Sequence, residues 1–248
     1  MTKKLILHIP HASTRIPIMD GYVADEKSLE KEMLKLTDWY TDDLFDSTDD
    51  EVIRADFSRI FCDAERFTDD EQEVMAKFGM GVLYEKRDDG EGMRNVSQAL
   101  REKVLPEFYW NHHVQFSEAV NNQLNHFGKA LIIDCHSYPS IPLNRDLDQT
   151  PNRPDFNIGT DTFHTPPYLV KLAEAFFENA GYTLGVDKPY SGAIVPLEHY
   201  QKNKNVQSIM LEINRALYLE EPGNEKSSNY AKIKMVTQEF ISVMKGSL

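Results

Sequence analysis

The segment Leu131–His136 constrains the fold of this chain more than any other. Three consecutive aliphatic residues lead into Asp134, Cys135 and His136, and prolines follow at positions 139 and 142. A short apolar run bounded by turn formers is typical of a buried strand. We therefore predict a core strand that ends in a loop, where His136 is held rigidly beside a cleft. Because buried histidines often only satisfy a hydrogen bond, His136 alone indicates no function.

Two other apolar runs repeat the pattern. Residues 4–7 lead to His8 and then His11, and a run beginning at Ser208 contains Glu212 among aliphatic residues. A carboxylate inside an apolar strand is costly unless it is paired or has a chemical role. Two histidines and an acid are components of a hydrolytic zinc site, which has three protein ligands and a water molecule.

The third ligand of such a site should be a carboxylate, and Asp38 is the candidate. Leu36, Tyr40 and Leu44 follow helical spacing around it, so Asp38 stands where a helical turn could begin. There are two interpretations of this position. Asp38 either binds a metal or caps a helix N-terminus, where acids are favoured.

Six short segments stand in order along the chain. They are His8–Ser13, Thr37–Leu44, Arg59–Phe67, Ile133–Ser137, Asp155–Thr160 and Leu211–Arg215. In these segments the chain resembles the N-formylglutamate amidohydrolase family, within the zinc-dependent exopeptidase-like hydrolases. The resemblance runs from residue 5 to about residue 219. It implies a zinc-exopeptidase-like (phosphorylase/hydrolase-like) fold and a role in amino-acid catabolism.

The resemblance also implies the roles of the site residues. His11, Asp38 and His136 would bind Zn²⁺ or another divalent ion, and Glu212 would act as general base and acid. The chain departs from zinc carboxypeptidases in one respect. Those enzymes use a compact His-x-x-Glu pair, whereas residue 14, three after His11, is threonine.

Charge limits the partners that the chain can bind. It has 27 basic and 40 acidic residues, a net charge of −13, which repels nucleic acid and acidic membranes. An anionic substrate therefore needs local cations, and Arg59 and Arg66 suit a bidentate grip on a carboxylate. Alternatively, Arg66 pairs with Glu65 or Asp69 on the surface. The substrate-binding set that we expect is Arg59, Arg66, Tyr190, Ser191 and Arg215.

These features predict a metal-dependent amidohydrolase that cleaves the N-formyl, or a similar small N-acyl, amide of an acidic amino acid such as N-formylglutamate. A carboxypeptidase-like or cell-wall-type amidase with the same metal site is one alternative. A metal-free binding or regulatory protein on the same fold is another. His164 and His199 stand in loops, where either could approach the cleft.

The alternation of elements predicts one α/β domain over residues 1–248, with a mostly parallel or mixed central sheet flanked by helices. Loops should lie at 87–92 and 139–157, and Cys62 and Cys135 could be neighbours. The absence of a signal peptide or long apolar segment favours the cytoplasm, whereas the oligomeric state stays open. We expect strands near 4–8, 52–57, 131–136, 182–186 and 207–213, and helices near 27–47, 69–77, 96–127, 166–180 and 227–245.

Overall fold

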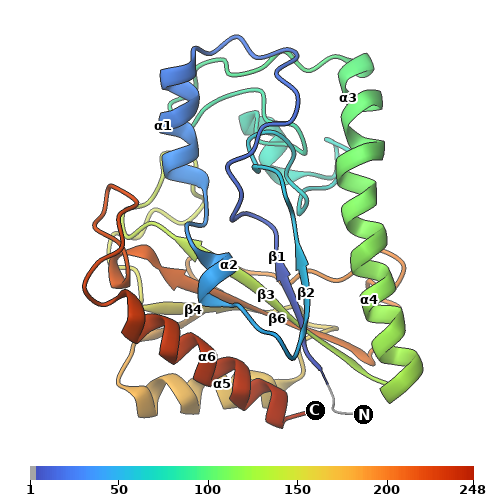
Figure 1. The fold of residues 1–248 in the computed structure, drawn as a ribbon, viewed down its shortest axis with the longest axis vertical. Coiled ribbons are helices and arrows are strands. Elements are labelled where there is room, and N and C mark those ends of the chain that lie inside the picture. The colour runs from blue at the N-terminus through green and yellow to red at the C-terminus, as the bar shows by residue number, and fades with distance from the viewer. Residues whose placement is uncertain (1–3) are drawn as a thin grey trace.

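One six-stranded sheet organises the computed structural model, which describes residues 4–248 (Figure 1). The strand order is β2-β1-β3-β6-β4-β5, and neighbours are parallel except for β4 and β6. The prediction of an α/β fold with a mixed sheet is confirmed, whereas residues 1–3 of the predicted domain lie outside the described residues. The strands are β1 (Ile6–Ile9), β2 (Glu51–Arg54), β3 (Ala130–Tyr138), β4 (Phe156–Gly159), β5 (Leu184–Val186) and β6 (Val206–Asn214).

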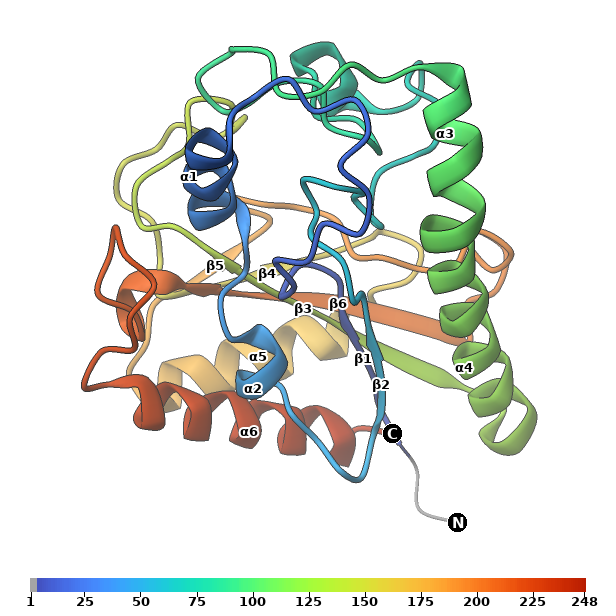
Figure 2. The ribbon, with the colours of Figure 1, turned by 45° about the horizontal axis from the view of Figure 1, so that its top comes forward.

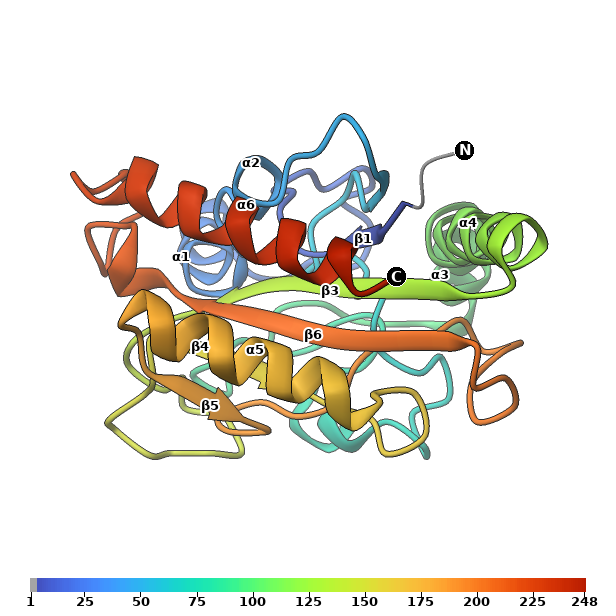
Figure 3. The ribbon, with the colours of Figure 1, turned by 90° about the horizontal axis from the view of Figure 1, so that it is seen from below.

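Helices cover both faces of the sheet. Figure 3 shows α5 and α6 side by side along β3 and β6. None of the helices within residues 4–248 is long and apolar enough to cross a membrane. The α-helices are α1 (Glu26–Leu36), α2 (Thr41–Leu44), α3 (Gln98–Val104), α4 (Asn111–Phe127), α5 (Pro167–Ala180) and α6 (Tyr230–Gly246). Two 3₁₀ segments, η1 (Val74–Phe78) and η3 (Arg215–Leu217), and a π segment, η2 (Leu105–Trp110), complete the set.

Alternate residues of β3 serve opposite faces of the sheet, as strand geometry requires. Leu131, Ile133 and Cys135 pack in the core that includes α5 and α6, whereas Ile132 packs with Phe116 of α4. Each fully buried aliphatic side chain contributes about 1.5–3 kcal/mol to stability. The even-numbered polar residues of β1, β3 and β6 therefore point to the α4 face, and the candidate site lies there.

The helix expected over residues 27–47 is interrupted. Asp25 caps α1 by accepting a hydrogen bond from Ser28 N at 2.8 Å, and α1 ends at Leu36. Tyr40 then adopts a left-handed conformation with φ 61° before α2 begins. Apolar residues keep helical spacing across this break, so the sequence pattern did not reveal it. The break presents Asp38 outside any helix.

The helix expected over residues 96–127 is one rod built of three segments: α3, η2 and α4 (Figure 2). Pro106 lies in the π segment η2, where its ring and missing N–H disfavour regular α-helical bonding. Such π segments are frequent near functional sites. The helix expected near 69–77 is the shorter 3₁₀ segment η1.

The long loop expected over residues 139–157 ends earlier, because β4 begins at Phe156. No strand was predicted at β4, which has four residues and pairs antiparallel with β6. So short a run contains too few residues to show strand periodicity. The other five strands lie where the sequence placed them.

Candidate active site

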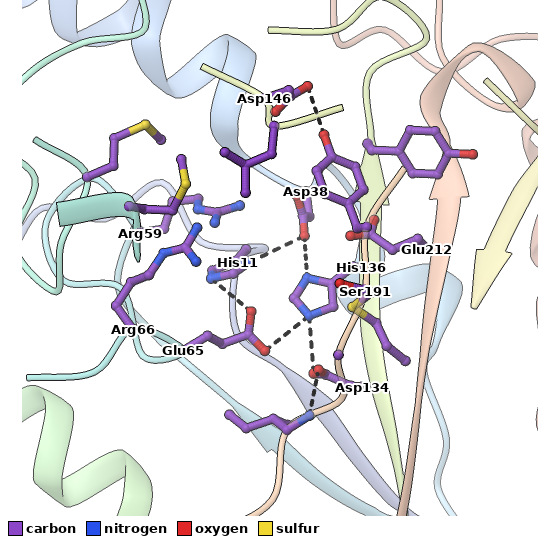
Figure 4. Close-up of a pocket in the computed structure, with 18 of the residues that line it drawn as sticks. His11, Asp38, Arg59, Glu65, Arg66, Asp134, His136, Asp146, Ser191 and Glu212 are labelled. Atoms are coloured by element: carbon purple, nitrogen blue, oxygen red, sulfur yellow. Dashed lines mark hydrogen bonds and ion pairs between the residues drawn. The ribbon is translucent and has the colours of Figure 1, made fainter. Parts of the chain in front are cut away.

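Four predicted site residues come from separate parts of the chain and meet in one pocket (Figure 4). His11 follows β1, Asp38 lies in the break between α1 and α2, His136 ends the polar face of β3, and Glu212 lies on β6. Strand pairing places His136 directly beside Glu212. The exposed fractions of all four are 7% or less, so every charge in the group is desolvated and needs a partner.

Hydrogen bonds orient the two imidazole rings. His11 Nε2 is hydrogen-bonded to Asp63 Oδ1 at 2.9 Å, which favours the tautomer of His11 that carries the proton on Nε2. His136 Nε2 is hydrogen-bonded to Glu65 Oε1 at 3.2 Å and lies 3.1 Å from Asp134 Oδ1, and its Nδ1 is hydrogen-bonded to Asp38 Oδ2. His11 Nδ1 has no hydrogen-bond partner among the described residues. Carboxylates orient metal-binding histidines in this way.

Asp38 lies between the two imidazole rings. Its Oδ2 is hydrogen-bonded to His136 Nδ1 at 3.0 Å and lies 3.6 Å from His11 Nδ1. Its Oδ1 accepts a hydrogen bond from Arg215 Nη2 at 2.9 Å. Two imidazoles and a carboxylate are a donor set that zinc uses, and the buried Nδ1 of His11 without a partner fits a metal ion. The carboxylate of Asp38 does not cap a helix.

Charge around the rings also favours a cation. Burial lowers the pKa values of His11 and His136, but the neighbouring carboxylates outweigh it and raise both above the usual imidazole range. Asp38, Asp63 and Asp134 have their pKa values lowered, although burial opposes the shift. The site therefore holds a surplus of negative charge, which a divalent ion would offset.

Glu65 is a site residue that the sequence did not reveal. Its Oε1 lies 3.2 Å from His136 Nε2, and its Oε2 lies 3.6 Å from His11 Nε2. Donor atoms of His11, Glu65 and His136 lie within 4.8 Å of one another, as do those of His8, Glu65 and Asp134. Glu65 is therefore an alternative carboxylate to Asp38 as a metal ligand, because it is hydrogen-bonded to His136 Nε2, whereas His11 Nε2 is hydrogen-bonded to Asp63. The one available sequence signal was its place within the family-like segment Arg59–Phe67.

A second layer of imidazoles supports Asp134. His8 is fully buried, and its Nδ1 lies 2.8 Å from Asp134 Oδ1. Its Nε2 lies 2.9 Å from Nε2 of His112 on α4. His8 thus contacts Asp134 but not the Nδ1 atoms of His11 and His136. The buried hydrogen bonds from His112 through His8 to Asp134 connect α4, β1 and β3.

Glu212 carries an oxygen without a partner. Its Oε2 has no hydrogen bond to the described residues, and burial raises its pKa to about 8. Arg215, three residues further along the chain, bonds to Asp38 and Ser137, and no ion pair between it and Glu212 is found within the described residues, so Glu212 stays available to a bound molecule.

Arg59 and Arg66 line the pocket beside His11 (Figure 4). Arg59 Nη2 donates to Asp63 Oδ2 at 3.1 Å. Arg66 Nε lies 3.5 Å from the same oxygen without a hydrogen bond, and Arg66 Nη1 lies 3.7 Å from Glu73 Oε1. The two guanidinium groups thus face the buried carboxylates of Asp63 and Glu73, and the N–H groups of Arg66 that make no hydrogen bond to these acids are available to an anionic ligand.

The remaining expected substrate-binding residues also line the pocket. The hydroxyl of Tyr190 donates to Asp146 Oδ2 at 3.0 Å and accepts from Arg153 Nη1 at 3.1 Å, and burial raises its pKa. Ser191 is next to it in the same loop. Arg215 is buried, and its hydrogen bonds to Lys35, Asp38 and Ser137 direct it to the support of Asp38.

The rings of His164 and His199 make their hydrogen bonds elsewhere in the fold. His164 Nδ1 lies 2.7 Å from Val206 O, and its Nε2 accepts from Gln201 N at 2.8 Å. His199 Nε2 lies 2.9 Å from Asn121 Oδ1. Neither lines the pocket, so the expectation that either approaches the cleft gains no support.

The two cysteines are buried and free. Cys135 belongs to the core cluster with α5 and α6, whereas Cys62 belongs to a cluster with Val104 and Tyr109. Burial raises the pKa of both thiols, which disfavours a nucleophilic thiolate.

Comparisons with known proteins bear on the family and on the fold. The sequence model of the N-formylglutamate amidohydrolase family matches residues 3–219. The crystal structure of N-formylglutamate amidohydrolase from Ralstonia eutropha JMP134 is similar, with a TM-score of 0.87, 22% identity, and coverage of 99% of this chain and 94% of that one. A gene product of Agrobacterium tumefaciens has a TM-score of 0.65 and 16% identity, with coverage of 99% and 92%. No curated protein matched the chain.

Proposed function

The chain belongs to the N-formylglutamate amidohydrolase family, and from that premise we propose that it is a metal-dependent hydrolase of N-acylated acidic amino acids. The observation that supports the proposal is the position of Asp38 Oδ2, 3.0 Å from His136 Nδ1 and 3.6 Å from His11 Nδ1, in the pocket that also holds Glu212 with its unpartnered oxygen. With N-formylglutamate, the reaction would consume one water molecule and release glutamate and formate.

In this proposal, His11, Asp38 and His136 hold the ion. Zinc suits two imidazoles and one carboxylate, although such a set also accepts other divalent ions. When bound, the ion would acidify a water molecule and polarise the amide carbonyl. Asp63 keeps His11 Nε2 protonated, Glu65 and Asp134 face His136 Nε2, and Arg215 holds Oδ1 of Asp38 so that Oδ2 faces the histidines.

Glu212 acts as the general base and acid. Its unpartnered Oε2 accepts a proton from water, and the same carboxyl group then delivers this proton to the departing amine. Burial raises its pKa to about 8, and a carboxyl group with a pKa near the working pH can both take up and release a proton.

Arg59 and Arg66 hold the carboxylates of the acidic amino acid. Local cations are needed because the chain as a whole carries a charge of −13. Tyr190 and Ser191 also line the pocket, where they would limit the orientation of the ligand. We propose Arg215 as a support for Asp38 as well as a pocket residue.

The cytoplasmic location stays a prediction.

The carboxypeptidase-like or amidase-like alternative keeps the same metal site. The size of the pocket, about 870 Å³, favours it because peptides are larger than N-formylglutamate. The metal-free alternative would suit a chain that lacked a ligand or the base, and this chain retains both.

A hydrolysis assay tests the proposal. Protein reconstituted with zinc should release glutamate from N-formyl-L-glutamate, and protein treated with chelator should lose that activity until zinc is restored. N-formyl-L-lysine is the matched control, because its side chain offers no second carboxylate. Release of lysine at an equal rate, or activity that resists chelation, would contradict the proposal.

A further inference from the structure

The pocket combines a buried polar interior with an apolar mouth. Its volume is about 870 Å³, within the roughly 300–1,000 Å³ range that accommodates drug-sized ligands. N-formylglutamate has only about 12 non-hydrogen atoms, so it would leave much of such a cavity empty. A ligand that fills the pocket must extend beyond the reacting amide.

Four exposed hydrophobic side chains line this pocket, and we call them the apolar rim: Phe67, Val74, Leu147 and Leu197. Their exposed fractions are 40%, 56%, 69% and 44%. They come from three segments that are distant in sequence: residues 67–74, the loop between β3 and β4, and the loop between β5 and β6. Apolar side chains gathered around a cavity mark a surface that binds an apolar group.

The positions of the other groups decide which part of the substrate reaches the rim. The catalytic residues are buried, so the amide lies deep in the pocket. Arg59 and Arg66, with side-chain exposures of 16% and 25%, take the carboxylates of the amino acid. The acyl group is the part of the substrate that remains to extend outwards to the rim.

The chemistry of the rim favours an acyl chain over a peptide. An apolar surface binds an uncharged acyl chain more readily than the charged amine of a dipeptide. Of the acidic side chains that line this part of the pocket, Asp146 is already paired with Arg153, whereas Asp148 and Asp187 accept hydrogen bonds from Thr150 and Thr160. A dipeptide is therefore included in the test.

Resting on the proposed function, we propose that the preferred substrates are acidic amino acids that carry an apolar acyl chain of medium length rather than a formyl group. The acyl chain contacts the apolar rim while the amino acid binds Arg59 and Arg66. Burial of each additional methylene should strengthen binding until the chain passes the rim.

The test measures binding and turnover separately. Dissociation constants for N-formyl-, N-butanoyl- and N-hexanoyl-L-glutamate are measured by calorimetry on zinc-loaded Glu212→Gln protein, and kcat/KM on zinc-loaded wild type. We expect N-hexanoylglutamate to bind at least about tenfold more tightly than the formyl compound. The Leu147→Ser/Leu197→Ser double variant should lose most of this difference while its affinity for N-formylglutamate stays unchanged.

Met235→Ser is the matched control, because Met235 is an equally exposed hydrophobic residue on α6, outside the pocket lining. It should leave the whole series unchanged. If wild type hydrolyses N-formylglutamate but affinity does not rise with acyl length, the inference fails and the proposed function stands. If L-leucyl-L-glutamate is a better substrate than N-hexanoylglutamate, the pocket binds peptides rather than acyl chains, and the inference fails. If no N-acylglutamate is bound or hydrolysed, both proposals fail.

Discussion

At the scale of single residues, Glu212 and His136 are neighbours in the sheet with different expected roles. Glu212→Gln should keep the metal and lower kcat by roughly 10²–10⁴-fold, because general acid–base catalysis contributes that much. His136→Ala should lose the metal itself, because the ligand is gone. Elemental analysis and initial rates distinguish the two variants, with His199→Ala as the control. A Glu212→Gln protein that lost its metal would exclude the role of Glu212 as a base alone.

Asp134 is the residue through which the buried imidazoles reach His136. Asp134→Asn should weaken metal binding by about 10–100-fold, because the amide cannot hold the proton on His136 Nε2 as a carboxylate does. Competition with a chromogenic chelator measures this affinity. The control is Asp43→Asn on α2, where the carboxylate bonds to Tyr230 and Lys234. This variant should leave the metal affinity unchanged. Equal metal affinity in both variants would refute the orienting role of Asp134.

Arg66 tests how the substrate is held. Arg66→Ala should raise KM for N-acylglutamates by roughly 10–100-fold with a smaller effect on kcat, because hydrogen bonds to charged groups contribute about 1.5–3 kcal/mol. Arg54→Ala removes an exposed arginine near Asp42 and serves as the control. An effect of Arg66→Ala confined to thermal stability would leave the carboxylate grip without support.

Sequence patterns indicated His11, His136 and Glu212 because each follows or interrupts an apolar run. They could not indicate Asp63, Glu65 or Asp134 as partners of these residues. His11 and Asp63 are 52 positions apart, and their contact depends on tertiary packing that no local periodicity records. Asp63 and Asp134 also follow apolar runs, but the pattern does not say which histidine each of them contacts.

At the scale of elements, the π segment η2 supports the arginine-bearing segment. Tyr109 of η2 donates to Arg66 O at 2.9 Å, and His113, which follows it in α4, lies 2.8 Å from Ala64 O. The widened turn therefore fixes the backbone that carries Asp63, Glu65 and Arg66. Regular helical periodicity did not predict it, because apolar spacing is nearly the same through a π turn.

Loss of one of these contacts should affect substrate binding. Tyr109→Phe should cost about 1 kcal/mol of unfolding free energy and raise KM for N-acylglutamates while kcat changes little. Urea denaturation and steady-state kinetics measure the two effects. Tyr168→Phe on α5, which loses a surface hydrogen bond to Gln207, is the control for stability alone. Unchanged KM in Tyr109→Phe would mean that η2 supports the fold without positioning Arg66.

At the scale of the whole molecule, the buried charges couple stability to pH and metal. The pKa values of His11 and His136 are raised in the folded state. Their protonation therefore contributes fully to the free energy of unfolding below about pH 6.5, and this contribution is lost as pH rises. Burial raises the pKa of Glu212 to about 8, so its ionisation destabilises the fold as pH rises from about 4.5 to 8. The lowered pKa values of Asp38, Asp63 and Asp134 stabilise the fold above about pH 4, and this contribution is lost on acidification.

The metal-free protein should therefore be most stable near pH 4–5 and less stable at pH 8, because folding then retains protons that the unfolded chain releases. A metal ion would replace those protons, so zinc should raise the melting temperature more at pH 8 than at pH 5. Thermal melts with and without zinc at both pH values measure this. His136→Ala should abolish the zinc effect, and an equal zinc effect at both pH values would contradict the prediction.

Mutations on the two faces of β3 should have different effects. Conservative changes at Ile133 or Cys135 alter packing against α5 and α6 and leave the site residues on the other face in place. Changes at Asp134 or His136 alter the site and leave that packing in place. Selection for stability and selection for catalysis can thus act on alternate residues of the same strand. Insertion of a single residue within β3 would exchange the two sets and remove both properties at once.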